Sequence, residues 1–121
     1  MVNHSRKTGD EVETLACQYL QQQGLKTLNR NFHCPRGELD VIMEDGDTIV
    51  FVEVRYRSNP RFGSSAESVT KSKQDKLITS AMYYLQQNPT HRDRPSRFDV
   101  VAVSLQNNKP DIDWIKSAFN A

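Results

Sequence analysis

The chain has 121 residues, of which 36% are hydrophobic and 26% are charged, and its formal net charge at pH 7 is +1. This length predicts one domain that buries enough apolar surface to fold without metal ions or disulfides. No apolar run is long enough for a membrane-spanning helix, so we expect no membrane partner. The near-zero net charge disfavours tight non-specific binding to long nucleic acid.

The N-terminal segment lacks the apolar stretch of a secretory signal, which predicts a cytoplasmic protein. Cys17 and Cys34 have no CxxC spacing and no neighbouring ligand cluster, so we expect reduced thiols and no structural zinc. Residues 1–8 are predicted to be a flexible tail, and residues 9–121 are predicted to form the single domain.

The first half of the chain predicts one helix and three strands. Residues 9–23 carry apolar side chains at helical spacing, and Gly24 follows at a capping position. A weak, edge-like strand over residues 25–32 leads into a turn at residues 34–37. Alternating residues 38–44 and the Val-rich segment 48–57 predict two strands joined by a hairpin.

The second half of the chain predicts a loop over residues 58–68 and a helix over residues 70–87 that ends before Asn88-Pro89. After a polar loop, residues 98–105 predict a Val-rich strand, and residues 112–115 a last short one. A helical crossover between residues 48–57 and 98–105 allows parallel pairing. The order αβββαββ therefore predicts an α/β domain with a mixed sheet flanked by helices.

Period-2 alternation sorts the hairpin into two faces. Leu39, Val41 and Met43 are predicted on the apolar face, and Asp40 and Glu53 on the other. A two-residue turn at positions 45–46 or 46–47 keeps this arrangement, and the second choice sets Asp40 directly opposite Glu53.

The near-zero net charge conceals a segregation along the chain. Residues 36–53 contain six acids and one base, whereas residues 55–76 contain six bases and two acids. Carboxylates as close as Asp40 and Glu53 repel each other, and a divalent cation relieves that repulsion. Arg55 on the same face can hold a phosphate oxygen. The alternative is a surface ladder of salt bridges among these strands.

Two segments, Gly37-Glu38-Leu39-Asp40-Val41-Ile42 and Phe51-Val52-Glu53-Val54-Arg55-Tyr56-Arg57, resemble the YraN-like family of bacterial proteins. That family is similar to the restriction-endonuclease-like PD-(D/E)XK nucleases, close to the Holliday junction resolvases. The resemblance covers nearly the whole chain. It implies a restriction-endonuclease-like mixed sheet flanked by helices and a Mg²⁺- or Mn²⁺-dependent endonuclease of DNA repair or recombination.

The resemblance also implies roles for individual residues. Asp40 and Glu53 correspond to the metal ligands, and Arg55 stands at the lysine of the E-x-K signature. Glu13, Glu38 and Gln74 correspond to positions that assist catalysis. Each of the three also has an ordinary structural interpretation. Glu13 can be a first-turn glutamate favoured by the helix dipole. Gln74 can form a hydrogen bond with a backbone group, and Glu38 can pair with Arg57.

Four basic residues are expected to hold the nucleic-acid backbone, which we expect to be DNA: Arg57, Arg61, Lys71 and Lys73. Resolvases act as dimers, so the resemblance also implies a homodimer. Asp99, in a Val-rich strand, is expected to have a structural hydrogen-bonding role. Tyr83, Tyr84 and Trp114 suit either an interface or, as we expect, the core.

Arg55 departs from the signature because arginine stays protonated and cannot act as a base. Two alternatives to a nuclease therefore stay open. One is a nucleic-acid-binding module of the same fold without catalysis. The other is a protein-interaction domain with a vestigial carboxylate cluster.

Overall fold

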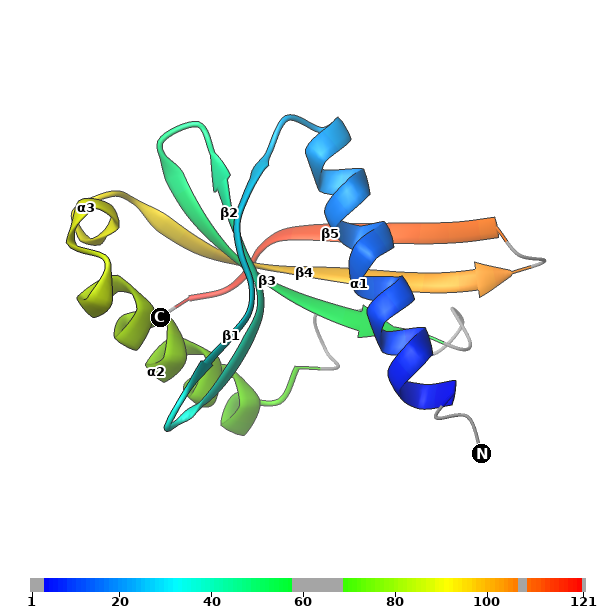
Figure 1. The fold of residues 1–121 in the computed structure, drawn as a ribbon, viewed down its shortest axis with the longest axis horizontal. Helices are drawn as coiled ribbons and strands as arrows, with labels where there is room; N and C mark the ends of the chain where they lie inside the picture. The colour runs from blue at the N-terminus through cyan, green and yellow to red at the C-terminus, as the bar shows by residue number, and fades with distance from the viewer. Residues whose placement is uncertain (1–3, 58–68, 107–108, 121) are drawn as a thin grey trace.

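A computed structural model describes residues 4–57, 69–106 and 109–120 of the chain (Figure 1). Three helices and five strands follow one another along the chain: α1 (His4–Gln22), β1 (Lys26–Cys34), β2 (Gly37–Asp45), β3 (Thr48–Tyr56), α2 (Lys71–Gln87), α3 (Pro89–Arg92), β4 (Ser96–Gln106) and β5 (Lys109–Phe119). The strands form one sheet in the order β1-β2-β3-β4-β5. The predicted α/β architecture with a mixed sheet is confirmed.

The sheet is antiparallel except between β3 and β4, which run parallel. The chain covers the distance between these two strands through α2 and α3. This arrangement confirms the predicted parallel pairing after a helical crossover. Within the described residues, no helix is both long enough and apolar enough to span a bilayer.

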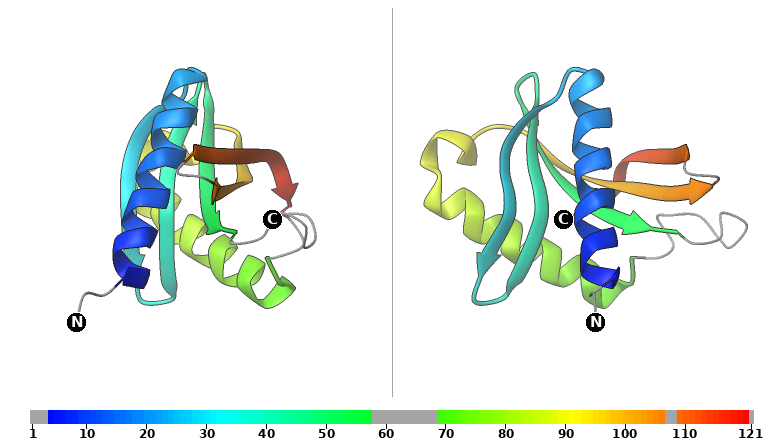
Figure 2. Two further views of the ribbon diagram at one scale, coloured as in Figure 1. Left: turned by 90° about the vertical axis from the view of Figure 1, so that its right-hand side faces the viewer. Right: turned by 45° about the vertical axis from the view of Figure 1, so that its right-hand side comes forward.

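Helices α1 and α2 lie on opposite faces of the sheet (Figures 1 and 2). An apolar cluster lies under each of them. On one face, Val12, Ala16 and Leu20 of α1 pack on valines of β2, β3 and β4. On the other face, Leu77 and Tyr84 of α2 pack with aromatic and branched side chains from the same strands. The helix periodicity read from the sequence therefore produces two cores that share the sheet.

Element ends differ from the prediction at several places. Helix α1 begins at His4, so it includes residues 4–8, which the sequence assigned to a tail. The short helix α3 occupies part of the predicted loop after α2. Strand β5 is longer than the predicted residues 112–115, because it pairs with β4 from Lys109 to Phe119. The predicted loop 58–68 lies outside the described residues.

The β2–β3 hairpin adopts the second of the two predicted turns. Asp45 pairs with Thr48, so Gly46 and Asp47 form the turn, and Gly46 takes the positive φ of +59° that such turns require. The same register sets Val41 opposite Val52. Continued by one residue, it places Asp40 level with Glu53.

One prediction about this hairpin is wrong: Leu39 does not share a face with Val41. Leu39 packs in the α2 cluster beside Phe32, whereas Val41 packs in the α1 cluster. Asn31, on the neighbouring strand β1, has a left-handed φ of +57° and lies between the residues that pair with Val41 and Leu39. Leu39 and Phe32 are thus buried together beneath α2, and the side chains of β2 do not alternate regularly between the two faces of the sheet at this point.

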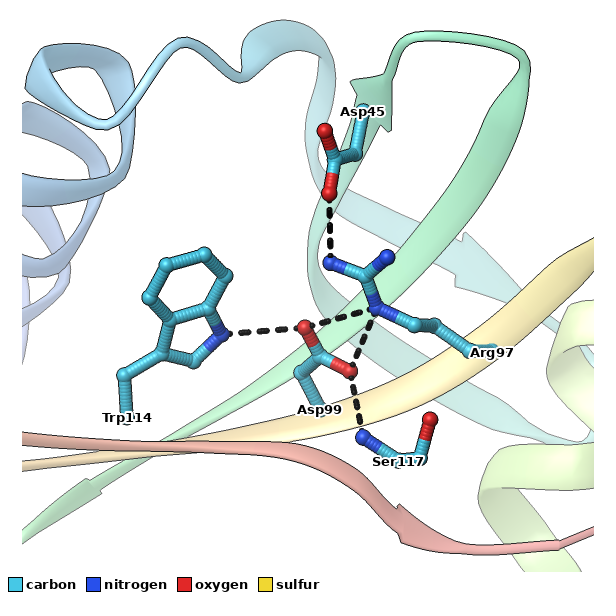
Figure 3. A network of polar contacts seen from close by, with 5 residues as sticks. All are labelled: Asp45, Arg97, Asp99, Trp114 and Ser117. Carbon is cyan, nitrogen blue, oxygen red and sulfur yellow. Dashed lines mark hydrogen bonds and ion pairs between the residues drawn. The ribbon is translucent and has the colours of Figure 1, made fainter.

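Asp99 joins β4 to β5 through a buried polar network (Figure 3). Its carboxylate accepts hydrogen bonds from Arg97 Nε, Trp114 Nε1 and the backbone N–H of Ser117, at 3.0, 3.0 and 2.9 Å. Arg97 also reaches Asp45 at 2.9 Å. The predicted structural role of Asp99 is confirmed, and Trp114 belongs to the α1 core.

Candidate functional site

Asp40 lies where β2 and β3 stop pairing. The last backbone pair of the ladder is Val41 with Val52. Beyond it, the Asp40 carboxylate accepts a hydrogen bond from the backbone N–H of Val54, with Oδ2 at 3.0 Å. The side chain thus satisfies a backbone donor that the ladder leaves unpaired, and this bond fixes the carboxylate between the two strands.

Glu53 of β3 is 6% exposed and lies beside Asp40. Burial, and after it the negative charge of Asp40, raise the pKa of Glu53 from 4.5 to about 7, although Lys73 acts in the opposite direction. A hydrogen bond with Asp40 also favours the protonated form. The structure therefore brings together the two carboxyl groups predicted as metal ligands, in a setting that resists two negative charges.

Two cations compensate part of this negative charge. Lys73 Nζ lies 3.1 Å from Oε1 of Glu53, and Arg55 Nη1 lies 3.8 Å from the same oxygen. Lys73 stands in the first turn of α2, whose start is fixed by the Thr70 hydroxyl accepting the Lys73 backbone N–H at 3.2 Å. Lys73 was predicted to contact a phosphate backbone, and the structure places it at the carboxyl pair.

Glu13 approaches Asp40 from α1. A hollow of about 260 Å³ is lined by Glu13, Glu38 and Asp40 among other residues. Burial raises the pKa of Glu13, and the charge of Asp40 adds to this effect, whereas Arg30 lowers it. Arg30 donates to Glu13 Oε1 from its Nε at 3.0 Å, and Asn31 donates to the same oxygen at 3.1 Å.

Sequence reasoning missed Arg30 because it lies on the weakly patterned edge strand β1. In the sequence, only the opposite charges of Arg30 and Glu13 point to this pair. Such charges predict an ion pair only when β1 is known to lie beside α1. Arg30 makes Glu13 part of an ion pair, so Glu13 does not face Asp40 as a free carboxylate.

The remaining predicted residues lie farther from the carboxyl pair or have structural partners. Glu38 pairs with His33 at 3.1 Å, and not with Arg57. Gln74 donates to the backbone carbonyl of Val69 at 3.0 Å, which matches the alternative considered for it.

The other predicted nucleic-acid contacts lie at the end of β3 and on α2. Arg57 follows β3, and its backbone N–H donates to the Val103 carbonyl at 2.9 Å. Lys71 is largely exposed and pairs with Asp75 at 3.1 Å. Arg61 lies outside the described residues.

The donor set at the centre of the site is two carboxyl groups. The part of the chain that the structure describes holds no group of three or more His, Cys, Asp or Glu side chains suited to a metal ion. A divalent ion held by Asp40 and Glu53 would complete its shell with water and phosphate oxygens, as Mg²⁺ commonly does. The raised pKa of Glu53 fits this chemistry, because a nearby cation would restore the charged form.

Comparison with known proteins gives consistent results over most of the chain. The sequence model of the uncharacterised protein family UPF0102 matches residues 12–103. A UPF0102 protein of Nitrosococcus oceani is 46% identical, covering 94% of this chain and 92% of its own. A relative from Pseudomonas syringae pv. tomato is 48% identical, with 96% and 94% covered. One from Pseudomonas aeruginosa is 49% identical, with 97% and 95% covered.

Proposed function

The chain belongs to the uncharacterised protein family UPF0102, and from the geometry of its site we propose that it is a metal-dependent nuclease. In this proposal the mixed sheet is of the restriction-endonuclease-like kind, and the substrate is DNA, including branched DNA such as a Holliday junction. The observation that carries the proposal is the contact between Asp40 and Glu53, in which the pKa of Glu53 is raised to about 7.

Asp40 and Glu53 would hold Mg²⁺ or Mn²⁺. When bound there, such an ion polarises a phosphate oxygen and lowers the pKa of a coordinated water. The hydrogen bond from Val54 fixes Asp40, and burial limits the motion of Glu53, so both ligands are oriented before a substrate arrives.

Lys73 offsets the departure at Arg55. A compact ammonium beside the carboxyl pair is what the signature lysine supplies in the nucleases that this sequence resembles. In this chain α2 provides the ammonium, 3.1 Å from Glu53. In the proposed reaction, Lys73 and Arg55 stabilise the negative charge that develops on the phosphate, and neither has to accept a proton.

Three further cations, Arg57, Arg61 and Lys71, are proposed to hold the DNA backbone around the site. Contacts of this kind position a substrate without reading its sequence. Cutting both strands of a junction requires two such sites, so a homodimer is part of the proposal.

A second candidate function is DNA binding without cleavage. It is favoured by one observation, namely that two of the acidic groups already pair with cations of the chain. Arg30 pairs with Glu13 and Lys73 pairs with Glu53. If these pairs persist on DNA, a metal ion gains little at the site, and only salt-sensitive binding is left.

A nicking assay on branched and linear DNA with Mg²⁺ or Mn²⁺ separates the two candidates. We expect cleavage by the wild type and none by Asp40→Asn. This variant keeps an oxygen that accepts the Val54 N–H, so its fold is preserved. Asp111→Asn, an exposed change on β5, is the matched control and retains cleavage. Binding without cleavage by the wild type supports the second candidate, and cleavage that survives Asp40→Asn indicates a contaminating nuclease.

A further inference from the structure

A groove follows the exposed side of α2, between that helix, α3 and the turn joining β1 to β2. Two adjoining hollows, of about 800 and about 510 Å³, form it and share Arg36 and Thr79 in their walls. None of the carboxyl groups of the proposed active site lines either hollow.

The floor of the groove is apolar and open. Met82 is 65% exposed, the highest value among the large hydrophobic side chains in the described part of the chain. Tyr83 and Leu85 line the same hollow and are half-buried. The unbranched side chain of Met82 can adapt its shape to different apolar partners. An apolar floor of this kind can therefore pack against the side chains of another protein.

The walls of the groove carry positive charge from three separate elements. Arg36 lies in the β1–β2 turn, Lys76 in α2 and Arg92 in α3. Within the ranges that the structure describes, none of these three makes an ion pair. The acidic residue in the groove, Asp75, is paired with Lys71 at 3.1 Å. The groove therefore presents an apolar floor with uncompensated cations at its edges.

We propose that this groove binds an acidic, amphipathic segment of a partner protein. Apolar side chains of that segment cover Met82 and Leu85, and its carboxylates pair with Arg36 and Arg92. The charge pattern selects this partner, because opposite charges across an interface favour encounter and fix register.

Two other occupants fit less well. A second copy of the same face would bring Arg36, Lys76 and Arg92 against their own equivalents, which is repulsive. A single strand of nucleic acid needs ring faces on which bases stack. Among the described residues, Tyr83 is the one aromatic residue that lines the two hollows, and its half-buried ring is tilted against Phe32 with centroids 6.4 Å apart. The other apolar lining residues, Met82 and Leu85, offer no ring face.

The test is a selection of random short peptides on the wild-type chain, followed by affinity measurement with labelled peptides. We expect the recovered peptides to carry Asp or Glu on either side of an apolar centre. Their affinity falls at least about tenfold in Arg36→Glu/Arg92→Glu and in Met82→Glu. Lys109→Glu, an exposed charge reversal on β5, is the matched control and binds as the wild type does.

The proposal is overturned if no peptide is recovered, or if the recovered peptides carry no excess of acidic residues. It is also overturned if they bind wild type and Arg36→Glu/Arg92→Glu equally. A short single-stranded DNA that competes with the peptide, and weakens with the same variants, assigns the groove to nucleic acid instead. Peptide binding by Asp40→Asn stays unchanged, so failure of the nuclease proposal leaves this one standing. Circular dichroism of each variant establishes that the fold is retained.

Discussion

Lys73 Nζ, in the first turn of α2, lies 3.1 Å from Oε1 of Glu53 in β3. This ion pair connects helix α2 to strand β3, the element that precedes it among the described residues. It also puts an ammonium group beside a carboxyl that is itself in contact with Asp40. In the proposed mechanism, Lys73 would compete with a metal ion for this oxygen. It lies closer to the oxygen than Arg55 Nη1, which is 3.8 Å away.

Replacing Lys73 by methionine is expected to have opposite effects on cleavage and on metal binding. Cleavage falls about 100-fold, because a charge that stabilises the transition state is lost. Affinity for Mn²⁺, measured by calorimetry without DNA, rises because the ammonium no longer occupies Glu53. Lys76→Met, a control farther along the helix, leaves both quantities unchanged. A parallel fall in cleavage and Mn²⁺ affinity would show that Lys73 only supports the fold.

The free energy of unfolding is expected to fall as the pH rises from about 4.5 to about 7. The pKa of Glu53 is raised from 4.5 to about 7, so between these values the folded chain binds a proton that the unfolded chain has lost. The stabilisation from the neutral carboxyl is complete below pH 4.5 and is lost by pH 7. A shift of this size corresponds to about 3 kcal/mol.

Urea unfolding of wild type and Glu53→Gln at pH 5 and pH 8 measures this effect. Glutamine cannot ionise, so the variant loses less stability than the wild type between the two pH values. Glu13, whose pKa is also raised, is present in both proteins and cancels in the comparison. Equal losses in the two proteins would contradict the assignment of the buried proton to the carboxyl pair.

Divalent ions are expected to stabilise the protein through Asp40 and Glu53. An ion that binds only the folded state at about 100 times its dissociation constant adds about 2.7 kcal/mol to the free energy of unfolding. The added stability is larger at pH 8 than at pH 5, because protons and metal compete for Glu53. Thermal unfolding with and without Mn²⁺ measures it. Asp40→Asn should abolish the effect, and an unchanged response would place the ion elsewhere.

Asp99→Ala is expected to reduce the free energy of unfolding by about 3–5 kcal/mol, as for other buried ion pairs from which one partner is removed. Removing the carboxylate leaves Arg97 Nε, Trp114 Nε1 and the Ser117 N–H without their common acceptor. Urea unfolding followed by Trp114 fluorescence reports the loss. The matched change Asp111→Ala, on an exposed part of β5, stays within about 0.5 kcal/mol of wild type. A small effect of Asp99→Ala would mean that β5 is held by its apolar contacts alone.

The local parts of the fold were predictable from the sequence. The helical spacing of α1 and α2 and the strand alternation around the hairpin turn depend on residues close in the chain. The same locality explains why Asp40 and Glu53 could be expected side by side, since a two-residue turn sets their register. It also explains the position of Gly24, whose φ of +101° ends α1 as expected.

Features that depend on distant contacts were not predictable in the same way. Leu39 packs under α2 together with Phe32 of the neighbouring strand β1, and no local pattern in β2 predicts this contact. The partners of Glu13 and Glu53 are Arg30 and Lys73, which come from β1 and α2. Their roles depend on how β1 and α2 pack against the rest of the sheet. Hydrophobic periodicity predicts each helix or strand separately, but it does not predict which side chains of different elements pair.

Strand order in the sheet is the same as strand order in the chain, with one long excursion between β3 and β4. Short-range strand pairs cost little chain entropy, so we expect the β1–β3 meander to assemble early and the crossover to follow. On this route the two acidic groups meet before their ammonium partner arrives. The folding chain would then pass through an intermediate in which Glu53 has no counter-ion. A lower pH or added divalent ions would relieve the repulsion with Asp40 and increase the folding rate.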